Sequence, residues 1–194
     1  MKHLDLGCGY KPKNPYGADE LYGVDIYPEI VELGDNFRLS NLATEKLPFK
    51  DSFFDSVSAF DVLEHVPRQA INFISGNVRL PFIELMNEVS RVLKSGGLFY
   101  AYTPVYPNPE VFLDPTHVNF ITRGTHEYFC GDAPYAKRYG FIGKFEIVEV
   151  CILNTRYASS AERDWKINLS AWYKTHIRSG RSNLIWQLRA VKQT

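Results

Sequence analysis

His3-Leu4-Asp5-Leu6-Gly7-Cys8-Gly9 stands near the start of the chain, and Tyr22-Gly23-Val24-Asp25-Ile26 follows it. Each run is a short apolar segment that reaches an acidic residue, which predicts a buried strand ending in a carboxylate. The glycines of the first run permit positive φ and let a ligand approach the main chain without a Cβ in the way. An Asp closing the second strand is well placed to accept both hydroxyls of a ribose. The two runs together predict that the chain holds an adenosyl group.

A dinucleotide is not expected at this turn. Its fingerprint, Gly-x-Gly-x-x-Gly, leads into a helix whose N-terminus faces a pyrophosphate. Pro12 takes the place of the third glycine, and residues 11–17 contain too much Pro and Gly for a regular helix. The sequence therefore argues against NAD and FAD.

The pattern resembles the class I S-adenosylmethionine-dependent methyltransferases. Four motifs carry the likeness in the order of that family: residues 4–9, 41–42 with 47–55, 61–66, and 88–97. They correspond to the first motif, the segment that closes over the adenine, the turn after the fourth strand, and the helix and glycine turn before the fifth. The resemblance implies an α/β fold with a doubly wound, seven-stranded, mostly parallel sheet of the Rossmann-like methyltransferase type. Its last strand would be antiparallel and inserted between the fifth and the sixth.

Alternating apolar strands and helical stretches independently predict an α/β domain with parallel strands. Strands are expected at residues 3–6, 22–26, 37–39, 54–60, 98–102, 145–153 and 184–191. Apolar residues recur at helical spacing over residues 82–94, which predicts an amphipathic helix that ends at Gly96-Gly97. The stretch between Gly9 and Asp25 is short for a strand-helix-strand passage, so the first helix is expected to be nearly absent. A subgroup of the resembling methyltransferases shares this shortened connection.

Composition fits one domain, residues 1–194, with 45% hydrophobic and 23% charged residues. No apolar run approaches the roughly 20 residues of a membrane helix, and the N-terminus lacks the pattern of a secretory signal. Cys8, Cys130 and Cys151 lie far apart without metal-ligand spacing, which predicts reduced thiols and no metal site. These features predict a cytoplasmic protein.

Charge is distributed unevenly along the chain. Residues 1–64 contain 6 Lys/Arg and 12 Asp/Glu, whereas residues 154–194 contain 8 and 2. The basic C-terminal part could face an anionic acceptor, or it could be a solvated face that complements the acidic half. In the resembling family, helices before the first strand often cap the substrate pocket. Since the expected first strand begins at residue 3, a lid is expected instead from residues 105–140 and 154–182, or from another subunit.

The resemblance assigns ten residues to S-adenosylmethionine: Asp5, Gly7, Cys8, Gly9, Asp25, Ile26, Asn41, Leu42, Phe60 and Asp61. Asp5 and the glycine turn would hold the methionine end, because an acid can pair with the amino group and turn N–H groups suit a carboxylate. Asp25 would accept from the ribose, with Ile26 against the adenine ring. Asn41 would accept from the adenine amino group in place of the usual Asp, and Leu42 would donate its backbone N–H. Beyond its place in this turn, Cys8 is expected to be a packing residue.

Two histidines, His65 and His117, are the candidate catalytic residues. His65 follows the predicted fourth strand, at the rim of the family's active site, where it could equally anchor the loop. His117 lies in residues 114–122, which resemble a segment of methyltransferases acting on glycans and other small metabolites. A sugar hydroxyl must lose a proton during transfer, so His117 is the hypothesised general base. Asp114, His117 and Tyr128 are the expected acceptor-binding residues.

The resemblance implies methyl transfer to a small-molecule or carbohydrate acceptor, with oxygen as the expected methylated atom. An RNA methyltransferase that uses the basic C-terminal part is the enzymatic alternative, and a cofactor-binding partner protein without turnover is the other. No membrane association is expected. The sequence gives no oligomer signal and is compatible with a monomer or a homodimer.

Overall fold

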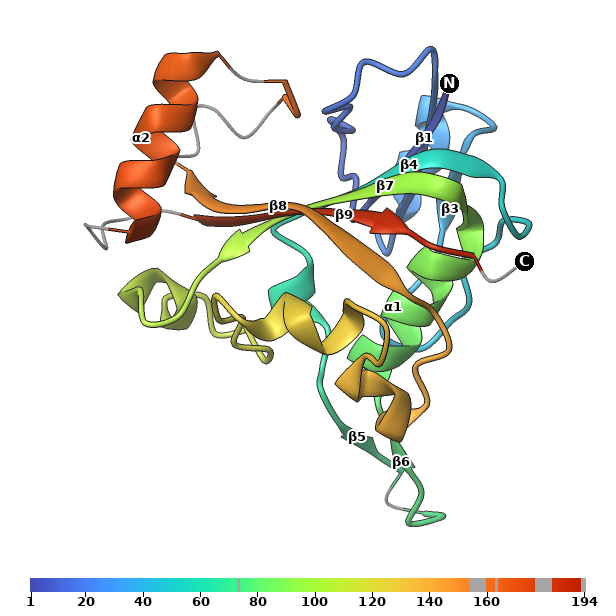
Figure 1. Ribbon diagram of the computed structural model, residues 1–194. Helices are drawn as coiled ribbons and strands as arrows, with labels where there is room; N and C mark the ends of the chain where they lie inside the picture. Colours follow the sequence, from blue (N-terminus) through green and yellow to red (C-terminus); the bar gives the residue numbers. More distant parts are fainter. Residues whose placement is uncertain (73, 154–159, 163, 177–182, 193–194) are drawn as a thin grey trace.

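The computed structural model describes residues 1–72, 74–153, 160–162, 164–176 and 183–192, and a seven-stranded sheet lies at its centre (Figure 1). The sheet has the order β3-β2-β1-β4-β7-β9-β8. Its strands are β1 (Lys2–Leu6), β2 (Glu20–Asp25), β3 (Phe37–Leu39), β4 (Phe54–Phe60), β7 (Leu93–Pro104), β8 (Phe145–Leu153) and β9 (Asn183–Ala190). Strand β9 lies between β7 and β8 and runs antiparallel to both of them. The predicted fold class is confirmed, including the inserted last strand.

The two central strands present different side chains to the two faces of the sheet. Leu4 and Leu6 of β1 are fully buried in the main apolar core, together with residues of β4. On the opposite face, His3 pairs with Ser56 and Asp5 with Ser58 in the parallel register. Alternation along each strand thus separates an apolar face from a buried polar one.

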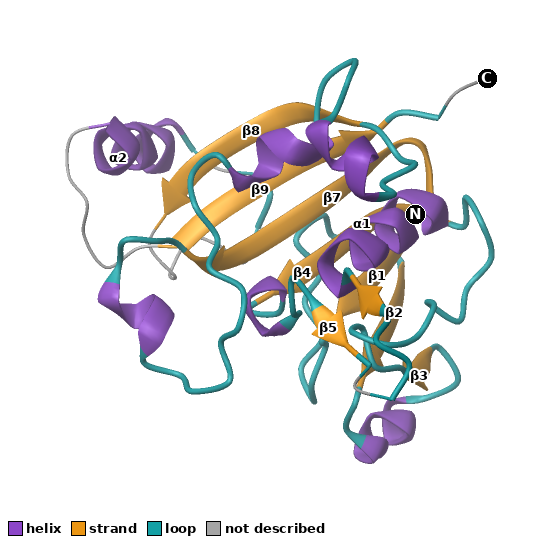
Figure 2. Ribbon diagram, turned by 90° about the horizontal axis from the view of Figure 1, so that it is seen from below, coloured by secondary structure: helices purple, strands orange, loops and turns teal. Residues whose placement is uncertain are grey.

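α1 (Pro81–Val92) covers the apolar face, as Figure 2 shows. Its buried positions recur at helical spacing and join the main core: Phe82, Leu85, Met86, Val89 and Val92. The opposite face has a smaller core that includes Tyr100, Tyr102 and Ile185, with Tyr16 and Ile167 packed against it. Ile167 belongs to α2 (Trp165–His176), a helix in the expected lid segment that the sequence did not predict. Both faces of the sheet are therefore covered.

The connection between β1 and β2 contains no helix, as predicted. Asn14 organises it instead, since its side chain accepts from the N–H of Ala18 at 2.8 Å and donates to the carbonyl of Ala18 at 2.9 Å. This turn brings Tyr16 onto the smaller core. The proline and glycine content of residues 11–17 is thus used in a loop that packs on the sheet.

The predicted end of the helix at Gly96-Gly97 is wrong. α1 ends at Val92, β7 begins at Leu93, and the glycines lie inside the irregular first part of that strand. Pairing with β4 shifts from Phe54–Leu93 to Ser56–Leu98, which leaves extra residues on β7. Gly96 has φ of 77°, a conformation that suits glycine, so the pair accommodates a bulge rather than a helix cap.

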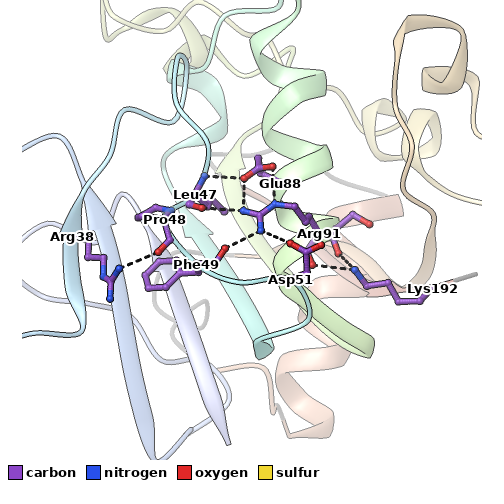
Figure 3. Close-up of polar contacts among 9 residues, drawn as sticks. Arg38, Leu47, Pro48, Phe49, Asp51, Glu88, Arg91 and Lys192 are labelled. Carbon is purple, nitrogen blue, oxygen red and sulfur yellow. Dashed lines mark hydrogen bonds and ion pairs between the residues drawn. The ribbon is translucent and has the colours of Figure 1, made fainter.

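Arg91 ties the last turn of α1 to the loop before β4 (Figure 3). Its guanidinium donates to the carbonyls of Phe49 at 2.8 Å and Leu47 at 2.9 Å, and to the Glu88 carboxylate at 2.6 and 2.9 Å. A further bond reaches Asp51 at 2.7 Å. The hydrogen bond to Glu88 is the main cause that raises the pKa of Arg91. This cluster gives the polar residues of the 88–97 motif a structural role, because it fixes the loop that leads into β4.

Residues 105–140 form short 3-10 helices connected by turns: η3 (Pro109–Phe112), η4 (Thr125–Phe129) and η5 (Tyr135–Tyr139). Two others are η1 (Pro28–Leu33) and η2 (Leu63–His65), and a small hairpin joins β5 (Ala70–Ile71) to β6 (Val78–Arg79). Residues 154–159, 163 and 177–182 of the second expected lid segment lie outside the described residues. In the part of the chain that is described, no helix has the length and apolar character needed to cross a membrane.

Candidate functional site

The carboxyl ends of β1, β2 and β4 lie side by side, because these strands are parallel neighbours. They carry Asp5 with the glycine turn, Asp25, and Phe60 with Asp61. Ligands of open parallel α/β sheets bind outside this edge, where the strand order reverses on either side of the first strand. The sequence-predicted cofactor residues of three motifs therefore share one edge.

Asp5 is held in a buried polar chain beneath this edge. Ser58 donates its hydroxyl to Asp5 Oδ1 at 2.6 Å, and the N–H of Lys13 donates to Oδ2 at 2.7 Å. His3 lies between the hydroxyls of Ser56 and Ser58 at 2.7 and 2.8 Å, and burial lowers its pKa to about 4. Burial raises the pKa of Asp5 to about 7, against the opposing effect of its two donors. The carboxyl is thus fixed in place at the end of β1.

The glycine turn is bound to β2 through its own backbone. The N–H of Cys8 donates to the carbonyl of Val24 at 3.1 Å, and the N–H of Gly9 donates to Asp25 Oδ2 at 2.9 Å. Two of the turn N–H groups, which were expected to suit a ligand carboxylate, therefore have partners inside the chain. Gly7 has φ of 63°, and a Cβ there would lie 2.4 Å from Val62 Cγ2. Gly9 has φ of 50° with nothing within 4 Å of such a Cβ, so the turn borders open space.

Cys8 lies beneath this turn and is 5% exposed. Burial raises the pKa of its thiol to about 12. A thiol in that environment stays protonated, which fits the expected packing role and excludes a thiolate nucleophile at neutral pH.

Asp25 is a buried carboxylate beside exposed apolar surface. Its Oδ1 accepts from the N–H groups of Ile26 at 2.7 Å and Tyr27 at 3.2 Å. The side chain of Ile26 is 61% exposed, and those of Tyr10 and Tyr27 are also exposed. A carboxylate next to uncovered apolar side chains is a suitable combination for a ribose and a base.

Asn41 and Leu42 lie after β3, where Asn41 is exposed and Leu42 packs at the margin of the main core. The side-chain carbonyl of Asn41 accepts from the N–H of Ala43 at 3.0 Å, a local turn contact. It retains a second lone pair for the predicted bond to an adenine amino group. Phe60 stacks on Tyr100 at 5.3 Å between ring centroids and so forms a wall beside the edge.

Asp61 holds an uncommon backbone conformation at the end of β4. Its φ is 53°, and its N–H donates to the carbonyl of Tyr102 on β7 at 2.8 Å. Such a conformation in a residue other than glycine is strained and is often found at functional sites. The side chain is open to solvent on one side, yet loss of surrounding water still raises the pKa of this carboxyl to about 6.

The two candidate histidines meet beyond the end of β4. The rings of His65 and His117 lie edge to face with 4.8 Å between their centroids. Nδ1 of His117 donates to the carbonyl of Val111 at 2.9 Å. The Thr116 hydroxyl donates to Asp114 at 2.6 Å and so accepts from Nδ1 of His65 at 3.0 Å. In the neutral rings, both lone pairs are therefore on Nε2.

Asp114 is linked to His65 through the Thr116 hydroxyl, which contacts both side chains. Toward the other histidine, Oδ2 of Asp114 lies 4.0 Å from Nε2 of His117, too far for a hydrogen bond. Thr116 is thus a residue that the sequence analysis passed over within the run it had selected. Burial and the neighbouring His117 lower the pKa of His65, which keeps that ring neutral at pH 7.

Glu64 is the other residue that the sequence analysis did not select. It is 1% exposed, and its Oε2 accepts from the Thr103 hydroxyl at 3.0 Å. Burial raises the pKa of Glu64 to about 7. Its backbone carbonyl accepts from the N–H groups of Val118 and Asn119 at 2.9 Å each, which fastens the His117 loop onto η2. The sequence did contain a signal for this residue, because Glu64 is the acid within the otherwise mostly apolar run 62–66. A Glu is rarely fully buried unless it has a partner, so a buried Glu at this position indicates a functional or structural role.

Tyr128 lies apart from the histidines on η4, with its ring 5.9 Å from that of Tyr135. It lines a cavity of about 910 Å³ whose walls are largely apolar. Neither histidine and none of the cofactor candidates lines this cavity, although Val118, next to His117, does. Of the three expected acceptor-binding residues, Asp114 and His117 therefore lie together beside His65, whereas Tyr128 lines the separate apolar cavity.

The geometry is that of an α/β domain whose parallel strands β1, β2 and β4 bring acidic residues to one edge of the sheet. The profile of the methyltransferase domain family matches residues 4–101, about half of the chain. An S-adenosylmethionine-dependent methyltransferase from Mesorhizobium loti superposes with a TM-score of 0.54 over 97% of this chain and 90% of its own, at 16% identity. The chain belongs to the class I S-adenosylmethionine-dependent methyltransferase family.

Two curated relatives resemble it in sequence. Sterol 4-C-methyltransferase strm-1 of Caenorhabditis elegans is 30% identical over 142 residues, which are 66% of this chain and 38% of that protein. Sterol 24-C-methyltransferase ERG6B of Gibberella zeae is 28% identical over 129 residues, which are 57% and 30%. The chain therefore spans well under half the length of these relatives.

The residues at the edge fit S-adenosylmethionine. The Asp25 carboxylate can accept from ribose hydroxyls, and the exposed Ile26 offers a face for adenine. The open space at Gly9 leaves room for the chain between ribose and sulfur. Asp5 is buried at 1% exposure, so its contact with the methionine end would pass through the turn or a water.

Proposed function

We propose that this chain transfers the methyl group of S-adenosylmethionine to a hydroxyl oxygen of a small-molecule or carbohydrate acceptor. The observation that carries the proposal is the pairing of His65 and His117 beyond the end of β4, beside the cofactor edge. Bound S-adenosylmethionine supplies an electrophilic methyl group on a sulfonium. The chain then has to place the acceptor oxygen in line behind that group and receive its proton.

Cofactor binding falls to the edge residues in this proposal. Asp25 accepts from the ribose, and Ile26 and Leu42 flank the adenine, with Asn41 accepting from its amino group. Gly7, Cys8 and Gly9 shape the turn over the methionine end, and Asp5 supports that turn through the N–H of Lys13. Phe60 and Asp61 form the wall between nucleoside and acceptor.

His117 is the residue proposed to receive the proton. Its Nδ1–H is fixed by the Val111 carbonyl, so Nε2 can accept from an acceptor hydroxyl. The carboxylate of Asp114, 4.0 Å from Nε2, would stabilise the imidazolium that results. The hydrogen bond to Thr116 would hold His65 as the second wall of the acceptor site.

The test is incubation with methyl-labelled S-adenosylmethionine and a panel of glycosides, phenols and sterols, with mass spectrometry of the products. His117→Gln is expected to lower kcat by about 100-fold or more, the usual contribution of a general base. Its affinity for S-adenosylhomocysteine should stay within about twofold, since His117 lies outside the cofactor contacts. His126→Gln replaces a buried histidine beside Trp186 and serves as the matched control. Full turnover by His117→Gln would remove that residue from the mechanism.

A second candidate is carbon methylation of a sterol-like acceptor. It is supported by the names of the two curated relatives and by the apolar cavity next to Val118, whose volume suits a mid-sized ligand. In the same panel, a product methylated on sterol carbon would favour this candidate. A product methylated on hydroxyl oxygen would favour the first.

A further inference from the structure

Glu64, His65 and His117 offer one carboxylate and two imidazoles at one point of the fold. One ligand atom from each lies within 4.8 Å of the others. We propose that these three side chains bind a divalent first-row transition-metal ion at the acceptor end of the site. The sequence predicted no metal site, because that expectation considered only the spacing of the cysteines.

Glu64 supplies the strongest independent observation. The side chain is 1% exposed, and no donor among the residues that the structure describes reaches its Oε1. Burying a carboxylate oxygen without a partner is costly, so such an atom in a folded protein calls for an explanation. Its other oxygen is already bonded to Thr103 at 3.0 Å. A cation between Glu64 and the histidines would satisfy the remaining one.

Both histidines are oriented as metal ligands usually are. A ligating histidine commonly donates its other ring N–H to a carbonyl or a carboxylate, which fixes the ring and the tautomer. His117 donates Nδ1–H to the Val111 carbonyl at 2.9 Å. His65 donates Nδ1–H to the Thr116 hydroxyl, and that hydroxyl donates in turn to the Asp114 carboxylate, so the carboxylate polarises the ring through Thr116. Each ring therefore keeps Nε2 for an ion.

The three ligands are fastened together by backbone contacts. Glu64 and His65 are consecutive in η2, and the N–H groups of Val118 and Asn119 bind the Glu64 carbonyl at 2.9 Å. Ligand atoms around an ion with bonds of about 2.1 Å lie about 3 Å apart, so side-chain rotation must close the 4.8 Å span by roughly 1–2 Å. Rotation of an imidazole or a carboxylate on its own backbone can supply that closure.

The donor set selects the kind of ion. Mg²⁺ and Ca²⁺ prefer sites built of oxygen, whereas imidazole suits Fe²⁺, Ni²⁺, Cu²⁺ and Zn²⁺. Mn²⁺ binds a site of this kind most weakly in the first-row series, and it serves here as the spectroscopic probe. Three protein ligands leave coordination positions open for an acceptor oxygen. The cluster therefore fits a catalytic rather than a closed structural site.

The role of this ion rests on the proposed function. A cation lowers the pKa of a hydroxyl that it binds, so the acceptor proton can pass to water without an imidazole base. The oxygen then forms its bond to the methyl carbon, and the carbon–sulfur bond breaks with its electron pair on sulfur. With the ion bound, Nε2 of His117 is a ligand and cannot also receive the proton, so the ion would replace His117 as the group that activates the acceptor hydroxyl.

The test measures Mn²⁺ binding by electron paramagnetic resonance on protein stripped with EDTA, with and without S-adenosylhomocysteine. One Mn²⁺ per chain is expected. Glu64→Gln, His65→Gln and His117→Gln should each weaken binding by at least about tenfold, and His126→Gln should bind like the wild type. Circular dichroism checks that each variant is folded, and His65→Gln, whose ring reaches solvent, keeps the test valid if Glu64→Gln does not fold. Lack of saturable binding at millimolar Mn²⁺, or equal binding by all variants, would overturn the metal site.

Activity separates this inference from the proposed function. Methyl transfer at full rate in stripped protein would overturn the role of the ion and leave the proposed O-methylation standing. Site-specific Mn²⁺ binding without methylation of any acceptor would support the metal site and overturn the proposed function.

Discussion

Replacing Asp25 with Asn is expected to weaken the binding of S-adenosylmethionine while leaving the chain folded. The carboxylate accepts from three backbone N–H groups, those of Gly9 at 2.9 Å, Ile26 at 2.7 Å and Tyr27 at 3.2 Å. An amide keeps the size of the side chain but converts one acceptor oxygen into a donor. The variant must therefore lose either the hydrogen bond from the N–H of Gly9 or the two hydrogen bonds from the N–H groups of Ile26 and Tyr27.

The magnitude follows from the charge that is lost. A hydrogen bond to a charged group contributes about 1.5–3 kcal/mol, and a ribose hydroxyl facing the amide of the Asp25→Asn variant would lose one such bond. The dissociation constant should therefore rise by about 10- to 150-fold. The unpaired N–H of the turn would also lower the free energy of unfolding by about 1–3 kcal/mol.

Isothermal titration calorimetry with S-adenosylmethionine and with S-adenosylhomocysteine measures the change in affinity. Thermal unfolding of each protein first fixes a temperature at which both are folded. Asp19→Asn is the matched control, because Asp19 precedes the opposite end of β2, with a side chain that is 84% exposed. Affinity of Asp25→Asn within twofold of the wild type, or an equal loss in Asp19→Asn, would refute the assignment of Asp25 to the ribose.

Three further predictions concern stability and reactivity. Arg91→Ala should lower the free energy of unfolding in urea by about 2–3 kcal/mol, since it breaks a partly exposed bidentate pair with Glu88 and two bonds to loop carbonyls. Asp5 keeps its proton up to about pH 7 in the folded state, whereas an unfolded Asp releases it near about pH 3.9. The folded state therefore binds more protons in that window, so the free energy of unfolding should fall between about pH 4 and 7, and Asp5→Asn should flatten the fall. The thiol of Cys8, whose pKa burial raises to about 12, should resist iodoacetamide at pH 8 in native protein and react in urea.

Each of these has a contrary outcome. Urea midpoints of Arg91→Ala and the wild type that coincide would show that the contacts of the Arg91 side chain in Figure 3 contribute nothing to stability. A pH profile of unfolding that is the same with and without the Asp5 carboxyl would show that this group does not hold its proton in the folded state. Rapid alkylation of Cys8 in folded protein would place its thiol in solvent.

The fold was largely predictable because its strands are short apolar runs closed by polar residues. The third strand at 37–39 and the fourth at 54–60 were predicted with the bounds that the structure has. The end of α1 was not, because Gly96-Gly97 fits both a helix cap and a bulge, and only pairing with β4 decides between them. The hairpin β5–β6 has two residues in each strand, too few for a periodic pattern.

The candidate site was predictable to the extent that it depends on local sequence. The turn and Asp25 follow one another along the chain, so their motif could be recognised directly. The approach of His65 and His117 depends instead on the bonds from Val118 and Asn119 to the Glu64 carbonyl, which no spacing rule indicates. Glu64, by contrast, lies inside the apolar run 62–66, and its burial could have been expected from that position.

A crystal structure of the complex with S-adenosylhomocysteine is the most direct measurement. The ribose hydroxyls should lie within hydrogen-bond distance of the Asp25 carboxylate, the adenine should cover Ile26, and the sulfur should face the His65–His117 pair. A nucleoside bound instead in the cavity beside Tyr128, with Asp25 still holding only its backbone partners, would contradict the assignment of the site.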